Sequence, residues 1–144
     1  MTYLISACLL GSPCRYDAKS KPIPEAIAAL LTEHVLIPIC PETLGGLPTP
    51  RIPAERRGAQ VINRAGEDVS EAYLRGAREV VRLCRLYRAD GVILRDRSPS
   101  CGTRGIYDGS FRGVLTEGEG VTAELLRREG IAVFCEDGPY NGEK

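Results

Sequence analysis

Two short apolar runs, each ending in a cysteine, lie on either side of a helix-forming stretch near the start of the chain. The runs are Tyr3–Cys8 and Val35–Cys40, and both read as buried strands. Between them, Pro24–Glu33 is rich in helix formers and has proline in its first turn. Two strands joined through a helix form a β-α-β unit, whose strands are parallel. The opening of the chain therefore predicts an α/β protein.

The same alternation of helices and strands continues to the end of the chain. Apolar residues recur every three or four positions over Ser70–Tyr87, which predicts a helix with its first residue as the N-cap. Gly91–Leu94 and Ile131–Phe134 read as further strands, with a helical stretch at Thr122–Arg128 between them. We therefore predict a three-layer, mostly parallel, doubly wound (Rossmann-like) sheet with helices on both faces.

The length of 144 residues suits one domain, which we place at residues 1–137, followed by a flexible C-terminal tail at residues 138–144. Two stretches, Gly45–Asp68 and Ser98–Gly120, are dense in turn-forming residues and poor in apolar ones. We interpret both as long loops that carry function.

Charge and composition limit the partners. Lys plus Arg and Asp plus Glu both number 19, so the zero net charge argues against nucleic acid as a partner. The sequence contains no apolar run long enough for a membrane span and no signal-like start, which predicts a cytoplasmic protein without a membrane partner. Six cysteines in a reducing compartment indicate metal or redox chemistry rather than disulfides. The oligomeric state is unknown at this stage.

Three cysteines follow three predicted strands. Cys8 and Cys40 end the first two, and Cys101 lies in the loop after the third. Ligands of an open parallel sheet bind beyond the carboxyl ends of its strands, so we expect these thiols to meet there. Three thiolates can hold a cubane iron-sulfur cluster with one iron open to a soft sulfur atom, while zinc with three cysteines and a water is the competing metal centre. The alternative is that each cysteine is a small buried hydrophobe.

The other three cysteines lie away from the ends of the first three predicted strands. Cys14, close after Cys8, is a possible fourth ligand, a resolving thiol or neither. Cys84 lies on the apolar face of a predicted helix, and Cys135 follows the last strand, so we expect both to pack in the core.

Polar residues near the thiols suggest catalytic roles. Glu42 is two residues from Cys40 and is our candidate general acid/base, although it could instead cap a helix or pair with Arg51. Ser98 and Ser100 flank Cys101 and could hydrogen-bond a cluster or a substrate carbonyl, with an N-cap as the plain alternative.

Candidate substrate-binding residues lie on the same loops. Arg51 follows a glycine-rich stretch and suits carbonyl or phosphate recognition. Arg15 and Asp17 could line the same pocket, although such pairs are more often structural. The only histidine, His34, receives no role.

Six motifs together resemble the thiouracil desulfidase family over nearly the whole chain. They are SACLLG at 6–11, RYD at 15–17, CPETLGGLPTPR at 40–51, GA at 76–77, SPSCG at 98–102 and YDG at 107–109. The resemblance implies a 4Fe-4S cluster on Cys8, Cys40 and Cys101, which air is expected to destroy. It also implies that the thiocarbonyl sulfur binds the open iron, water adds at the carbon and hydrosulfide leaves without net redox. Glu42 then handles protons and Ser98 orients the substrate.

Two functions follow as hypotheses. The first is a cluster-dependent desulfidase acting on a small thiolated base or nucleoside such as thiouracil. The second is a non-catalytic sensor or carrier module that binds an iron-sulfur cluster or zinc. Many relatives lack a cysteine at the position of Cys14, so its presence here leaves a four-thiolate cluster open.

Overall fold

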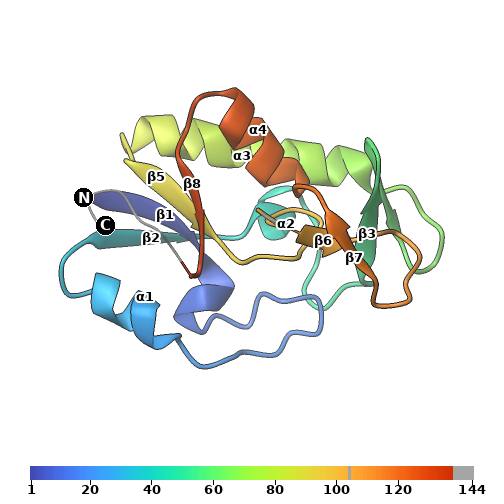
Figure 1. The fold of residues 1–144 in the computed structure, drawn as a ribbon, viewed down its shortest axis with the longest axis horizontal. Helices are drawn as coiled ribbons and strands as arrows, with labels where there is room; N and C mark the ends of the chain where they lie inside the picture. The colour runs from blue at the N-terminus through green and yellow to red at the C-terminus, as the bar shows by residue number, and fades with distance from the viewer. Residues whose placement is uncertain (104, 138–144) are drawn as a thin grey trace.

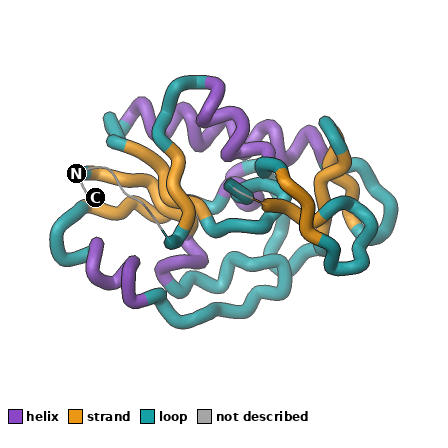
Figure 2. Tube along the Cα trace, viewed as in Figure 1, coloured by secondary structure: helices purple, strands orange, loops and turns teal. Residues whose placement is uncertain are grey.

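A four-stranded parallel sheet forms the centre of the computed structural model, which describes residues 1–103 and 105–137. Its strands are β1 (Thr2–Ser6), β2 (Val35–Ile39), β5 (Gly91–Leu94) and β8 (Val133–Cys135), in the order β2-β1-β5-β8. All four run in the same direction, so their carboxyl ends share one edge. In Figures 1 and 2 that edge faces the remaining loops and short strands.

Helices cover both faces of this sheet (Figure 1). Helix α1 (Glu25–Leu30) lies on one face, whereas α3 (Ser70–Leu86) and α4 (Val121–Arg128) pack side by side on the other. The predicted three-layer, doubly wound α/β fold is therefore confirmed.

Strand pleating divides the core into two halves. In β1, Leu4 packs toward α3 and α4, while Tyr3 and Ile5 pack toward α1, and all three are fully buried. In β5, the side chain of Ile93 lies on the same face as α1, and those of Val92 and Leu94 lie on the opposite face. Each such side chain contributes about 1.5–3 kcal/mol of hydrophobic free energy. Strands β1 and β5 are thus rigid supports for the segments that follow them in the chain.

Strand β2 corrects one prediction. The run Val35–Cys40 was interpreted as a buried strand, but β2 lies at the edge of the sheet and Val35 is 59% exposed. Pro38 lies within it, opposite Ile5. Proline has no N–H for a second neighbouring strand, so an edge position suits it.

The two stretches interpreted as long loops each contain an antiparallel hairpin, so that prediction was wrong in part. The first hairpin pairs β3 (Ala54–Arg57) with β4 (Gln60–Asn63), and the second pairs β6 (Gly105–Tyr107) with β7 (Leu115–Glu117). Their strands have three or four residues and little apolar alternation, which hides them from periodicity. A usable signal was Gly58, whose φ of 58° opens a two-residue turn.

The local helix details also differ from expectation. Ser70 is the first residue of α3, not its N-cap, and its hydroxyl accepts the N–H of Val61 at 2.8 Å. Two short helices were not predicted: α2 (Pro41–Leu44) and a single 3-10 turn, η1 (Ala7–Leu10).

In the part of the chain that the structure describes, none of the helices combines the length and the apolar character needed to traverse a lipid bilayer. The predicted tail at residues 138–144 lies outside the described residues. The single-domain assignment stays a prediction.

Candidate functional site

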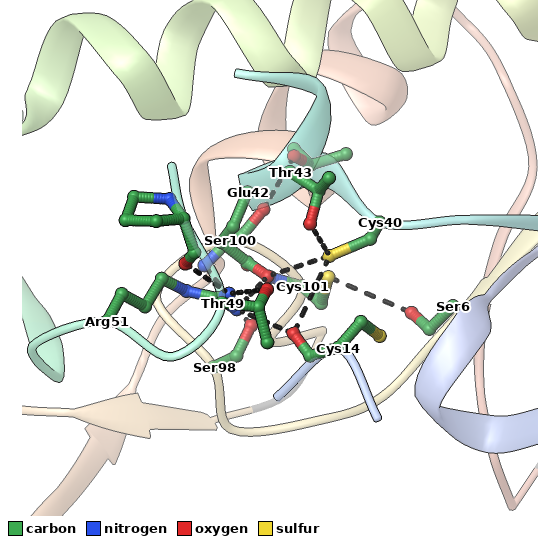
Figure 3. Close-up of polar contacts among 12 residues, drawn as sticks. Ser6, Cys14, Cys40, Glu42, Thr43, Thr49, Arg51, Ser98, Ser100 and Cys101 are labelled. Carbon is green, nitrogen blue, oxygen red and sulfur yellow. Dashed lines mark hydrogen bonds and ion pairs between the residues drawn. The ribbon is translucent and has the colours of Figure 1, made fainter. Parts of the chain in front are cut away.

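Three of the cysteines lie just beyond the carboxyl ends of three strands. Cys8 is in η1 after β1, Cys40 precedes α2 after β2, and Cys101 is in the loop after β5. The Cys14 thiol hydrogen-bonds with the sulfurs of both Cys8 and Cys40. After burial and the charge of Glu42, a negative charge on Cys8 also raises the pKa of Cys101, so Cys101 lies within electrostatic range of Cys8. The structure therefore brings the four thiols into one cluster, part of which Figure 3 shows.

Helix α2 places Cys40 because it packs against α3 without side chains between the two backbones. A Cβ atom on Gly45 would overlap the carbonyl oxygen of Ala72, and one on Gly76 would overlap the carbonyl oxygen of Pro41. Only glycine permits this approach at either position. The pair of glycines therefore fixes how close α2, and the Cys40 that precedes it, stands to α3.

The loop that carries Cys101 is held from within and from α4. The Ser98 hydroxyl accepts the backbone N–H groups of Ser100 at 3.2 Å and Cys101 at 2.7 Å. Ser100 is fully buried, and its hydroxyl hydrogen-bonds that of Thr122 at 2.8 Å. Ser100 therefore anchors the loop to α4, and its predicted contact with substrate stays a prediction. Ser98 performs the capping role given as its plain alternative, and its proposed part in substrate orientation stays a prediction.

Two of the four thiols ionise easily. The hydrogen bond from Cys14 is the main cause that lowers the pKa of Cys40 to about 5, against the opposing effect of burial. The Thr43 hydroxyl, 3.3 Å from the Cys40 sulfur, and the Arg51 charge lower it further. The pKa of Cys8 falls to about 6, again mainly through Cys14. Metals bind thiolates rather than thiols, so both sulfurs are suited to ligation at neutral pH.

The pKa values of Cys101 and Cys14 are raised instead. Burial, followed by the charge of Glu42, raises the pKa of Cys101 well above its usual range, and this thiol is only 5% exposed. Hydrogen bonds to Cys40 and Cys8 raise the pKa of Cys14. A positively charged centre would be needed to draw the proton from Cys101.

Glu42 combines the two interpretations that the sequence left open. Its Oε2 accepts an Arg51 N–H at 3.1 Å and the Cys40 thiol at 3.6 Å, so the ion pair with Arg51 is present. Its Oε1 is buried and has no hydrogen-bond partner among the described residues. Burial, then the neighbouring charge of Cys40, raises the pKa of Glu42 to about 7 despite Arg51. A carboxyl group with such a pKa can give or take a proton at neutral pH.

Arg51 is mostly occupied by the protein. Besides Glu42, its guanidinium donates to the carbonyl of Cys14 at 3.1 Å and to two acceptors on its own loop, and its side chain is 9% exposed. Figure 3 shows it reaching across the site from that loop. The geometry favours a residue that orients Glu42, and its predicted contact with substrate stays a prediction.

Arg15 and Asp17 lie on the neighbouring loop and pair with each other at 3.9 Å. Asp17 also accepts the N–H of Lys19 at 3.0 Å, as in a turn. The backbone N–H of Arg51 donates to the carbonyl of Tyr16 at 2.8 Å, which joins this loop to the site. The pair is thus near the thiols but engaged with its own loop, and its predicted role in substrate binding is untested.

Known proteins similar to this chain point to one family. The family model described as 2-thiouracil desulfurase matches residues 3–138. The chain belongs to this family. A Bacillus subtilis (strain 168) protein, YbbK, described as uncharacterized, is 41% identical over 93% of this chain and 95% of its own length. A solved structure described as the 4Fe-4S-dependent thiouracil desulfidase TudS is 47% identical, has a TM-score of 0.89, and covers 94% of this chain and 91% of that one.

In this member of the 2-thiouracil desulfurase family, three residues beside the thiols were not predicted from the sequence. Arg95 follows β5 directly and lowers the pKa of Cys8, and its Nε is buried without a hydrogen-bond partner among the described residues. Ser6 accepts the N–H of Arg95 at 3.1 Å and donates to the Cys101 sulfur at 3.8 Å. The third is Thr43. The strand-end rule that selected the cysteines could have selected Arg95 as well, since it also follows a predicted strand.

The cysteines assigned to packing are buried. Cys84 lies in the core between α3 and the sheet, as predicted, and Cys135 is 4% exposed at the end of β8. All six cysteines are in the described part of the chain, and none forms a disulfide.

Proposed function

We propose that this protein is an iron-sulfur-dependent desulfidase that removes sulfur, as hydrosulfide, from a thiolated nucleobase such as thiouracil. The observation that carries the proposal is the meeting of Cys8, Cys40 and Cys101 beside the buried carboxyl group of Glu42. Membership of the 2-thiouracil desulfurase family and the likeness to TudS point to the same activity.

The residues of the site fit a 4Fe-4S cluster. Thiols from three separate loops, two with lowered pKa values, supply the soft ligands that iron-sulfur clusters use. Among the described residues, no three Cys, His, Asp or Glu side chains are placed to hold a single metal ion. Ligands of one zinc ion lie about 4 Å from one another, because each Zn–S bond is about 2.3 Å long. The ligands of a cubane cluster bind different iron atoms and need not converge on one ion, so this finding favours a cluster over a single zinc ion.

When bound, the cluster supplies a Lewis-acidic iron with affinity for sulfur. The protein supplies the proton chemistry and the positioning. Glu42 takes a proton from the attacking water and can return it to the departing sulfur, so no net redox is needed. Arg51 holds the Glu42 carboxylate in place, and Ser98 holds the Cys101 loop and can orient the substrate carbonyl.

The substrate is proposed to be a free base or nucleoside rather than RNA, since the net charge is zero. We also propose a cytoplasmic location, in keeping with six cysteines outside disulfides.

The test is to purify the protein without oxygen and to measure iron, zinc, acid-labile sulfide and sulfide release from 2-thiouracil. Wild-type protein is expected to be brown and active. Cys8→Ser, Cys40→Ser and Cys101→Ser should each lose the cluster, while Cys84→Ser, which changes a thiol in the core, should keep it. Glu42→Gln should keep the cluster and lose most of the activity. A cluster without turnover would favour the sensor or carrier role, and zinc retained in air would favour a zinc site.

A further inference from the structure

Cys14 is the one thiol of the four-cysteine cluster that the proposed function does not use. It lies on the loop between η1 and α1, away from any strand end, yet its thiol hydrogen-bonds with both Cys8 and Cys40. No other thiol contacts two of the three proposed ligands in this way within the described residues. Its position is therefore next to the centre that those ligands would hold.

The backbone of Cys14 is fixed by the same groups that fix the acid. Arg51 donates one hydrogen bond to the carbonyl of Cys14 and one to Glu42, each at 3.1 Å. The Cys40 thiol lies 4.0 Å from the same carbonyl, and the backbone N–H of Cys14 donates to the carbonyl of Ser12 at 2.9 Å. The loop is thus held against the site, and its thiol is presented there without any need for a large movement.

The site also lacks a partner for a buried polar atom. Oε1 of Glu42 has no hydrogen-bond partner among the described residues, although its other oxygen is shared by Arg51 and Cys40. A buried carboxylate oxygen without a partner is costly, which indicates that something absent from the protein chain completes this site. The backbone carbonyl of Cys14 contacts Cys40 and Arg51, the two groups that share the other Glu42 oxygen.

We propose that Cys14 is a fourth sulfur ligand of the cluster in the substrate-free protein, at the iron where the thiolated base binds. The inference rests on the proposed function. Four thiolates are the usual complement of a cubane cluster, and Cys14 is the only cysteine placed to complete it, because Cys84 and Cys135 are buried elsewhere in the fold. A thiolate at this position excludes water and other hard ligands, whereas a soft thiocarbonyl sulfur can compete with it.

The test compares wild-type protein, Cys14→Ala and the matched control Cys84→Ala, each loaded without oxygen with ⁵⁷Fe. Mössbauer spectra report whether one iron differs from the other three. Brief oxidation with ferricyanide then reports how firmly that iron is held, because loss of one iron(II) and transfer of one electron to ferricyanide leave a paramagnetic three-iron cluster.

Wild-type protein and Cys84→Ala are expected to show no distinct iron and to keep all four. Cys14→Ala should bind the same amount of iron, show one distinct site and lose one iron in four on oxidation. The KM for 2-thiouracil should fall several-fold in Cys14→Ala, since no thiolate then competes with the substrate.

Equal iron loss and identical spectra in wild-type protein and Cys14→Ala, with both proteins active, would overturn the role of Cys14 and leave the desulfidase proposal standing. If neither Cys14→Ala nor Cys14→Ser held any cluster, Cys14 would be a permanent ligand. That result would overturn the proposal that the substrate displaces it. Wild-type protein that binds no iron would overturn both proposals.

Discussion

Replacement of Gly76 by alanine should separate two opposing effects on α3. Alanine is the better helix former, so propensity alone predicts a gain of about 1 kcal/mol in stability. The structure predicts a loss, because the new Cβ would overlap the carbonyl oxygen of Pro41 and stand 2.9 Å from its carbonyl carbon. Both atoms belong to the backbone of α2, so no side chain can rotate away.

The size of the effect follows from the contact distances. Carbon atoms in good contact are about 3.5–4.0 Å apart, so the contact with the Pro41 carbonyl carbon alone requires α2 to move by about 0.6–1.1 Å, and the overlap with the carbonyl oxygen requires a larger shift. Overpacking of this kind typically costs about 1–3 kcal/mol, which outweighs the gain from propensity in most of that range. The net loss of up to about 2 kcal/mol should lower the melting temperature by up to about 8 °C in a chain of this size.

The functional effect should exceed the effect on stability. Cys40 and Glu42 are both attached to α2, so the same shift displaces a ligand and the acid together. Misplacement by about 1 Å can cost on the order of a hundredfold in rate. Anaerobic thermal unfolding, iron content and sulfide release would be measured for Gly76→Ala, with Arg78→Ala on the exposed side of the same helix as the control.

A Gly76→Ala protein with unchanged or higher melting temperature and full activity would refute the close contact between α2 and α3. Gly45→Ala gives an independent check, because its Cβ would overlap the carbonyl oxygen of Ala72 from the opposite side of the same contact. Both glycine variants should have a lower melting temperature and lower activity. The free energy of unfolding of Arg78→Ala should stay within about 0.5 kcal/mol of the wild-type value.

Three further changes test the charges and hydrogen bonds. The pKa of Glu42 rises from 4.5 to about 7 on folding. Between these pH values the folded, cluster-free protein holds a proton on Glu42 that the unfolded chain releases. The folded state therefore loses stability relative to the unfolded state as the pH rises from 4.5 through 7. Glu42→Gln should therefore gain up to about 3 kcal/mol relative to wild type between pH 4.5 and 8 in urea unfolding, and a difference that does not vary with pH would contradict the assignment. Thr43→Val removes the 3.3 Å hydrogen bond to the Cys40 sulfur and should lower the reduction potential of the cluster by at most about 60 mV in a spectroelectrochemical titration; an unchanged or higher potential would exclude the bond. Glu124→Gln breaks the 2.8 Å ion pair with Arg56 and should cost about 0.5–1 kcal/mol at pH 7, and because that pKa is lowered, the cost should disappear as the pH falls below 4.5.

The sheet could be predicted from the sequence because its strands are short apolar runs with a helix between them. Tyr3–Cys8 and Gly91–Leu94 gave the two central strands, and the strand-end rule then placed Cys8 and Cys101 at the same edge. Such strands can be recognised in the sequence because a strand buried on both faces is apolar throughout.

The hairpins could not be predicted in the same way. Glu55 is typical: its carboxylate lies in β3 and accepts the N–H groups of Gly109 and Phe111, at 3.0 and 3.1 Å, which joins the first hairpin to the loop of the second. This contact spans more than fifty residues and involves a charged side chain where an apolar one would be expected in a strand. Periodicity contains no information about such a pairing.

In the site, too, some residues could be predicted from the sequence and others could not. The cysteines were identified by where they fall along the chain, but the roles of their neighbours depend on directions in space. Ser100 is adjacent to Cys101 in sequence and points to Thr122 instead, whereas Arg95 is six residues away and interacts with Cys8. Which side of a loop faces the thiols is decided by tertiary packing.

The three proposed ligands belong to widely separated parts of the chain, at positions 8, 40 and 101. No fragment ending before Cys101 can contain the full set, and a break in the turn at Gly58 would divide the set between two pieces. Colour from a bound cluster would therefore report that distant halves of the polypeptide have come together, and it could be used to follow the refolding or reassembly of split chains.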